Sequence, residues 1–94
     1  MAKISEVKGK HQKHQVMLYA LSTCIWCKKT KKLLEDLDVT FNYVFVDHLS
    51  GKEEQEIMDQ VRKHNPGCTF PTMVIDNGKV IVGLKEPEIK KELA

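Results

Sequence analysis

The spacing of hydrophobic residues changes several times along the chain, and each change predicts a different element of secondary structure. Residues 16–21 form a short, continuous apolar run, which is typical of a strand buried on both faces of a sheet. From Cys24 onward, apolar residues recur at three- and four-residue steps with lysines outside this stripe, which predicts an amphipathic helix. Ser22 and Thr23 lie between the two elements, and both are residues that commonly cap a helix.

The rest of the chain predicts a strand, a helix, a β-hairpin and a last helix. The hairpin is indicated by Asn77-Gly78, the dipeptide that best fits a two-residue turn between antiparallel strands. The final helix opens at Glu86, with an acidic residue and a proline suited to a helix start. The elements expected before it are a strand at 41–46, a helix at 53–63, and strands at 72–75 and 79–82.

This order of elements predicts an α/β fold with a mixed sheet. A strand–helix–strand unit requires a right-handed crossover and a parallel pair of strands, whereas the hairpin requires an antiparallel pair. We therefore expect about four strands, flanked by about three helices, in one domain over residues 16–94. Residues 1–15 are polar and basic, and two interpretations of them remain open: a short edge strand around Ile4 and Val7, or a solvated tail.

Composition narrows the classes of function. The 94 residues are 41% hydrophobic and 30% charged, as in a globular domain, and the net charge of +2 is too small to predict nucleic-acid binding. No apolar run approaches the length of a transmembrane helix, and the first 15 residues contain no apolar segment of the kind found in signal peptides. We expect a cytoplasmic monomer that binds neither membranes nor nucleic acid.

Two of the three cysteines, Cys24 and Cys27, form a C-x-x-C pair, which is typical of redox or metal chemistry. The pair lies where the first strand passes into the first helix. A helix N-terminus stabilises a thiolate through its free N–H groups and its dipole. We therefore expect Cys24 to be an exposed nucleophile with a lowered pKa, and Cys27 to be the more shielded, resolving cysteine.

Other side chains offer competing interpretations. His11 and His14 could join Cys24 and Cys27 as four zinc ligands, and an iron–sulfur cluster bridging two subunits through Cys24 is a further possibility. Both would make the protein a metal-binding module rather than an enzyme. Cys68 is either a third redox thiol, a glutathionylation site or an inert apolar residue.

Residues 16–94 resemble the glutaredoxin branch of the thioredoxin superfamily. The resemblance implies a thioredoxin-like fold in which Pro71 is a cis-proline facing the cysteines, and the backbone of Phe70 pairs with an extended substrate segment. Thr69, Phe70 and Pro71 are then expected to bind substrate, and Trp26 to form an apolar wall beside Cys24. The matching segments are Val16-Met-Leu-Tyr19, Ser22-Thr-Cys24-Ile-Trp-Cys27-Lys-Lys29, Leu33-Leu34 and Thr69-Phe-Pro71-Thr72.

The resemblance implies a thiol–disulfide oxidoreductase that reduces disulfide-containing client proteins through a reversible Cys24–Cys27 disulfide. It needs no tightly bound cofactor, and its electron donor would be glutathione or another low-molecular-weight thiol. Two departures weaken the case for glutathione: Leu21 replaces a lysine typical of the family, and Lys85-Glu86 replaces a pair of aspartates. The alternative donor is a flavoprotein reductase of the thioredoxin reductase type.

Overall fold

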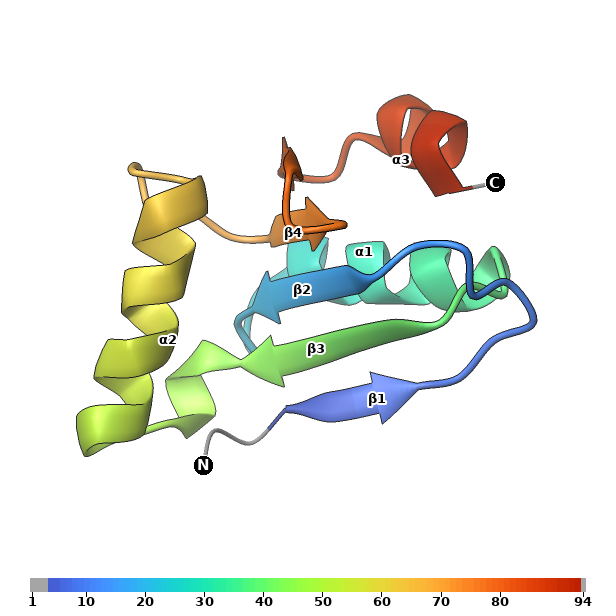
Figure 1. The fold of residues 1–94 in the computed structure, drawn as a ribbon. Helices are drawn as coiled ribbons and strands as arrows, with labels where there is room; N and C mark the ends of the chain where they lie inside the picture. The colour runs from blue at the N-terminus through green and yellow to red at the C-terminus, as the bar shows by residue number, and fades with distance from the viewer. Residues whose placement is uncertain (1–3, 94) are drawn as a thin grey trace.

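Five strands form one mixed sheet in the order β1-β3-β2-β4-β5, and three helices pack on it in the computed structural model, which describes residues 4–93 (Figure 1). The strands are β1 (Ser5–Val7), β2 (Val16–Ala20), β3 (Phe41–Phe45), β4 (Thr72–Ile75) and β5 (Lys79–Val82). The helices are α1 (Ile25–Asp36), α2 (Gly51–His64) and α3 (Glu86–Leu93), with a 3₁₀ helix η1 (Val46–His48) after β3.

The centre of the sheet is β2, and its neighbours confirm the mixed topology expected from the sequence. It pairs in parallel with β3 and antiparallel with β4, and β4 continues through the Asn77-Gly78 turn into the antiparallel strand β5. Because β2 and β3 are parallel, their carboxyl ends meet at the same edge of the sheet, at the left in Figure 1. The C-x-x-C pair follows β2 at this edge.

The sheet has one strand more than the four expected, because part of the N-terminal segment pairs with β3. Ser5–Val7 runs antiparallel to β3, with Val7 opposite Phe41. The segment then follows the chain that enters β3: the Gly9 N–H donates to Thr40 Oγ1 at 3.0 Å, and the His11 N–H donates to the Asp38 carbonyl at 3.0 Å. Three residues with one partly buried side chain leave too weak a pattern to choose the edge strand over a tail.

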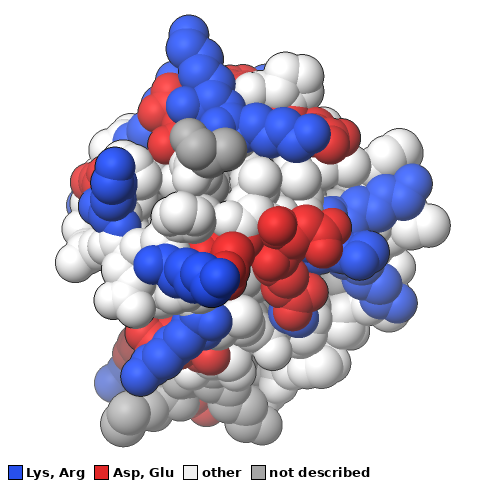
Figure 2. Space-filling model, turned by 90° about the vertical axis from the view of Figure 1, so that its right-hand side faces the viewer, with Lys and Arg blue, Asp and Glu red and all other residues white. Residues whose placement is uncertain are grey.

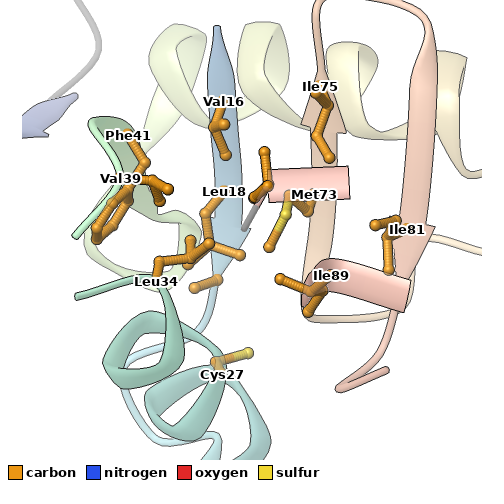
Figure 3. Close-up of a cluster of buried hydrophobic side chains, with 12 residues drawn as sticks. Val16, Leu18, Cys27, Leu34, Val39, Phe41, Met73, Ile75, Ile81 and Ile89 are labelled. Atoms are coloured by element: carbon orange, nitrogen blue, oxygen red, sulfur yellow. The ribbon is translucent and has the colours of Figure 1, made fainter. Parts of the chain in front are cut away.

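Alternating residues of the strands point to opposite faces and give the protein two hydrophobic clusters. The first cluster joins the sheet to α1 and α3 (Figure 3) and contains Val16, Leu18, Ala20, Cys27, Leu34, Val39, Phe41, Met73, Ile75, Ile81, Ile89 and Leu93. The second cluster joins the other face to α2 and contains Tyr19, Val44, Val46, Leu49, Ile57, Val61 and Val74. The sheet is therefore covered on both faces, with α1 anchored through Cys27 and Leu34.

Two helix starts differ from expectation. Helix α1 is capped by Cys24 itself rather than by Ser22 or Thr23, because those two residues form a turn that hydrogen-bonds elsewhere. Helix α2 begins at Gly51, two residues before the expected start, and Gly51 has a φ of +61°, which a glycine adopts without strain. Among residues 4–93, no helix is long and apolar enough to cross a membrane.

Candidate active site

A tight turn links β2 to α1 and places the two cysteines. The turn runs from Leu21 to Cys24, where the Cys24 N–H donates to the Leu21 carbonyl at 3.2 Å. It is held from outside by Asp47 of η1, whose carboxylate accepts a hydrogen bond from the Ser22 N–H at 2.8 Å and another from the Ser22 hydroxyl. The sequence analysis did not single out Asp47. The signal that could have found it is an acidic residue placed directly after a strand predicted to pair with β2.

Cys24 occupies the N-cap position of α1, and its side chain performs the capping. Its Sγ accepts a hydrogen bond from the Cys27 N–H at 3.2 Å, so a free amide of the first helical turn is satisfied by sulfur. Partial burial acts to raise the pKa of Cys24. The hydrogen bonds from the Cys27 side chain and from the Cys27 and Trp26 N–H groups outweigh this effect, and the pKa lies below its ordinary value.

Cys27 is the opposite case, because it lies inside the first hydrophobic cluster with only 1% of its surface exposed. Burial and the neighbouring Cys24 side chain raise the pKa of Cys27 to about 12, and the charge of Asp47 acts in the same direction. The Leu21 N–H donates weakly to its Sγ at 3.5 Å. The pair therefore offers one accessible thiol that ionises readily and one buried thiol that does not.

Beside the cysteines, the surface is hollowed into an open groove of about 320 Å³. Trp26 forms one wall with 55% of its surface exposed, and Lys29 Nζ lies 4.9 Å from the centre of its ring. Of the four residues predicted to bind substrate, Trp26, Phe70 and Pro71 line this groove and Thr69 does not. The remaining lining residues are Gly83 and Leu84.

The segment before β4 forms the far side of the groove. The Phe70–Pro71 peptide bond is cis, and the Pro71 carbonyl accepts a hydrogen bond from the Gly83 N–H at 2.8 Å. Among residues 4–93, the backbone N–H and C=O of Phe70 pair with no other backbone group. These two groups are therefore available to an extended segment of a substrate.

Asn65 organises this segment, and the sequence analysis did not single it out. Its Nδ2 donates to the Thr69 carbonyl at 3.2 Å and to the hydroxyls of Thr69 and Thr72 at 3.1 Å each. The Thr69 side chain is thus engaged within its own loop. Cys68 lies in the same loop, half-buried and with a φ of +51°, and does not line the groove.

The structure also shows where the two departures from the usual glutathione-binding pattern lie, at Leu21 and at Lys85. Leu21 packs against the second hydrophobic cluster, so this position presents a partly buried aliphatic chain rather than a cation. Lys85 is exposed directly before α3, and its carbonyl accepts a hydrogen bond from the Ile89 N–H at 2.9 Å. Lys85 follows Leu84 of the groove and puts a positive charge at the first of the two aspartate positions, whereas Glu86 keeps a negative charge at the second.

The four-ligand zinc site considered in the sequence analysis is not assembled. His14 is instead directed to Asp76, with Nδ1 2.7 Å from Oδ2, and His11 belongs to the segment that pairs with the entry to β3. In the part of the chain that the structure describes, no three His, Cys, Asp or Glu side chains are grouped as a metal site.

Comparison with known proteins identifies the family. A model of the glutaredoxin family, described simply as Glutaredoxin, matches residues 16–81. The chain belongs to the glutaredoxin family. An uncharacterized glutaredoxin-like 8.6 kDa protein in the rubredoxin operon of Clostridium pasteurianum is 36% identical over 76 residues, which cover 81% of this chain and 93% of that protein.

Solved glutaredoxin structures show the same fold. The glutaredoxin from Methanosarcina mazei Go1 is 53% identical and superposes with a TM-score of 0.88 over 97% of this chain and 87% of that chain. The methanoredoxin of Methanosarcina acetivorans is 48% identical, with a TM-score of 0.87 over 92% of this chain and 90% of that chain. The resemblance and the thioredoxin-like fold are confirmed, and a glutaredoxin domain with a Cys24–Cys27 pair suggests a thiol oxidoreductase.

Proposed function

We propose that this glutaredoxin reduces protein disulfides through a reversible Cys24–Cys27 disulfide. The observation that carries the proposal is the contrast between the two thiols. Cys24 is accessible and hydrogen-bonded at a helix N-terminus, which lowers its pKa, whereas Cys27 lies one helical turn away in the core with a raised pKa. A thiolate is the reacting form in disulfide exchange, so the reaction begins at Cys24.

The exchange takes place in two steps. Cys24 thiolate attacks one sulfur of the client disulfide, forms a mixed disulfide, and expels the other client sulfur as a thiolate that takes a proton from solvent. Cys27 then loses its proton, attacks Cys24 Sγ, and releases the second client sulfur as a thiol after protonation. The client gains two electrons and two protons, and the protein ends with a Cys24–Cys27 disulfide.

The groove supports a polypeptide as the client. Its walls are mostly apolar, and Ile25 and Trp26 beside the cysteines expose 61% and 55% of their surfaces. Phe70 offers unpaired backbone groups to an extended segment, which is the geometry of a short β-strand addition. Aromatic side chains at the centre of an interface commonly contribute most of the binding free energy. Trp26 and Phe70 are therefore proposed as the main client contacts, with Pro71 shaping the groove and Thr69 supporting the loop.

The electron donor is proposed to be glutathione or another low-molecular-weight thiol, as is usual for the family, with no tightly bound cofactor. A donor anion would meet Lys29 and Lys85 near the groove rather than a cation at position 21. The alternative is a flavoprotein reductase. Both cysteines belong to one chain, so a monomer suffices, and a dithiol reductant would operate in a reducing compartment such as the cytoplasm.

Offering two donors separately to the oxidised protein tests the proposal. One donor is reduced glutathione, and the other is NADPH with a thioredoxin reductase. The single tryptophan, Trp26, lies beside the disulfide, so its fluorescence follows reduction, and thiol counting confirms the stoichiometry. We expect glutathione to reduce the pair and the reduced protein to cleave insulin disulfides. If only the flavoprotein reduces the pair, the electron donor is the flavoprotein rather than glutathione. A reduced protein that leaves insulin disulfides intact would refute the proposed reduction of protein disulfides.

A further inference from the structure

The contact between Ser22 and Asp47 joins the active-site turn to the neighbouring strand. Ala20 and Phe45 are register partners at the ends of β2 and β3, and Asp47 follows Phe45 by two residues. The carboxylate of Asp47 accepts hydrogen bonds from both the N–H and the hydroxyl of Ser22. Ser22 follows β2 and Asp47 follows β3, so these two hydrogen bonds hold the ends of the two strands together in a defined orientation. We call this contact the clasp.

The clasped turn contacts both cysteines through Leu21, the residue next to Ser22: the backbone of Cys24 and the sulfur of Cys27. The Leu21 carbonyl accepts the Cys24 N–H at 3.2 Å, which sets the backbone of the helix cap. The Leu21 N–H points to Cys27 Sγ at 3.5 Å. A displacement of Ser22 would therefore change the position of the Cys24 cap and the surroundings of Cys27 together.

Asp47 also carries a charge that distinguishes the two thiols. The hydrogen bonds from the Ser22 hydroxyl and N–H lower the pKa of Asp47, so the carboxylate is ionised at neutral pH. Its charge is the smallest of the causes that raise the pKa of Cys27, after burial, the hydrogen bond with Cys24 and the charge of Cys24. The pKa of Cys24 is governed by burial and by hydrogen bonds with Cys27 and Trp26. The charge of His48, the next residue of η1, also acts to lower the pKa of Asp47.

We propose that Asp47 is a positioning residue for the dithiol, acting through Ser22: its two hydrogen bonds fix the turn that places Cys24 at the helix N-terminus and the Leu21 N–H at Cys27 Sγ. This inference rests on the proposed exchange reaction. Geometry and charge then act on different steps. The clasp promotes the first attack by Cys24, and the carboxylate slows the second attack by Cys27.

Asn and Ala at position 47 separate the two contributions. Asp47→Asn keeps an oxygen for the Ser22 N–H and supplies an N–H₂ donor to the Ser22 hydroxyl, so the clasp persists without charge. Asp47→Ala removes clasp and charge together, and Ser22→Ala removes one hydrogen bond while leaving the charge. Asp59→Asn is a matched control, because Asp59 is an exposed aspartate on α2 that pairs with Arg62.

The two steps can be read in one stopped-flow experiment in which reduced protein is in excess over 5,5′-dithiobis(2-nitrobenzoate). The first thionitrobenzoate is released when Cys24 attacks, in a bimolecular phase, and the second when Cys27 resolves the mixed disulfide, in a unimolecular phase. Peptide mass mapping after alkylation assigns the first phase to Cys24 rather than Cys68. Rates measured from pH 5 to 9 give the ionisation profile of Cys24, and circular dichroism confirms that each variant is folded.

We expect Asp47→Ala and Ser22→Ala to slow the first phase about three- to tenfold at pH 6 and to move its profile to higher pH, because a hydrogen-bonded support of the thiolate is lost. Asp47→Asn keeps the clasp, so the rate of the first phase should stay within about twofold. Removing the negative charge makes the Cys27 thiolate easier to form, so the second phase should become about two- to fivefold faster. The effect is modest because an exposed charge is partly screened. Asp59→Asn should change neither phase.

Equal profiles for wild type, Asp47→Ala and Ser22→Ala would overturn the positioning role, and a second phase unchanged in Asp47→Asn would overturn the charge effect. These outcomes are separate from failure of the proposed function. The reagent reports on the thiols alone, whereas a wild-type protein that reacts in two phases with the reagent but reduces no protein disulfide would contradict the function.

Discussion

The two ends of the central strands use their polar groups in opposite ways. At the end away from the cysteines, Asp76 accepts hydrogen bonds from the Gln15 N–H at 2.8 Å and contacts His14 at 2.7 Å, which ties the entry of β2 to the β4–β5 turn. Figure 2 views the molecule from this side, and basic and acidic side chains lie next to one another on it. At the cysteine end, Asp47 ties the turn after β2 through Ser22, but two further hydrogen bonds end on sulfur, and Ile25 and Trp26 are left in solvent.

This difference shows which end is built for stability and which for contact. Polar ties at the far end close the sheet with groups that are already satisfied in the free protein. Exposed apolar side chains at the cysteine end give their burial free energy only when a partner covers them, at about 25 cal/mol per Å² of apolar surface. Substitutions should therefore separate into those that alter reactivity and those that alter stability.

The largest expected effect is the loss of chemistry at the cysteine end. Cys24→Ser should abolish disulfide exchange, a fall on the order of 1,000-fold or more, because a hydroxyl at this position is not ionised at neutral pH. Cys27→Ser should retain the first attack and accumulate mixed disulfides with clients. Insulin reduction and mass spectrometry of trapped complexes measure both outcomes. Full exchange activity in Cys24→Ser would contradict the assignment of the nucleophile.

A large effect on stability is expected at the other end, from Gly9→Ala. A Cβ at Gly9 would clash with the Asp38 carbonyl oxygen and lie 2.8 Å from the carbonyl carbon of Val39. Because these are backbone atoms of the entry to β3, the clash should lower the free energy of unfolding by about 1–3 kcal/mol. Urea denaturation measures the change. A folded Gly9→Ala protein that reacts at Cys24 more slowly than wild type would contradict the expectation that this end affects stability and not reactivity.

An intermediate effect is expected from Trp26→Ala, which removes an exposed wall of the groove. Stability should change little, since the side chain is 55% exposed, whereas KM for a protein disulfide should rise about tenfold, the equivalent of about 1.4 kcal/mol of client binding. Ile25→Ala removes exposed apolar area from the same helix turn but outside the groove, so KM should rise less than in Trp26→Ala. Equal KM values for wild type and Trp26→Ala would show that clients bind elsewhere.

The smallest expected effect is a pH-dependent change in Tm from a substitution of Asp76, at the end away from the cysteines. The hydrogen bond with His14, followed by the one from the Gln15 N–H, holds the pKa of Asp76 below its ordinary value of 3.8. A lowered pKa in the folded state stabilises the fold above the ordinary value, and this contribution disappears as the pH falls through the folded-state pKa. Asp76→Asn should therefore lower Tm by less than about 3 °C at pH 7, and by progressively less as the pH falls below the ordinary pKa of an aspartate. A Tm difference that grows on acidification would contradict the assignment.

Local patterns in the sequence were enough to predict most of the fold. The apolar run before the cysteines, the helical spacing after them and the Asn77-Gly78 turn each depend on neighbours within a few residues, and β2, α1 and the hairpin lie where these patterns placed them. The strand β1 was undecided because its pairing depends on the free edge of β3, which lies more than 30 residues away. Tertiary pairing rather than propensity determines such a short edge strand.

In the candidate site, too, local sequence predicted some features, and others depend on tertiary contacts. The C-x-x-C spacing and its position after a strand predicted two unequal thiols, since a helix N-terminus has free N–H groups in any context. The identity of the cap was missed, because Ser22 is directed to Asp47 and leaves Cys24 to cap the helix with its own sulfur. Asn65, which holds the loop before Pro71, was missed for a similar reason, since its partners are fixed by the fold of that loop.

The sequence by itself determined the elements, the mixed sheet and the pair of cysteines proposed to carry the chemistry, because these follow from periodicity, turn residues and spacing along a few residues of chain. Only the tertiary structure decided which polar groups meet at the end of the sheet. The pairing of β2 with β3 brings Asp47 to Ser22, and the packing of α1 on the first cluster buries Cys27 while leaving Cys24 and Trp26 accessible. These contacts join residues distant in sequence, so their energies depend on distances that a linear pattern does not contain.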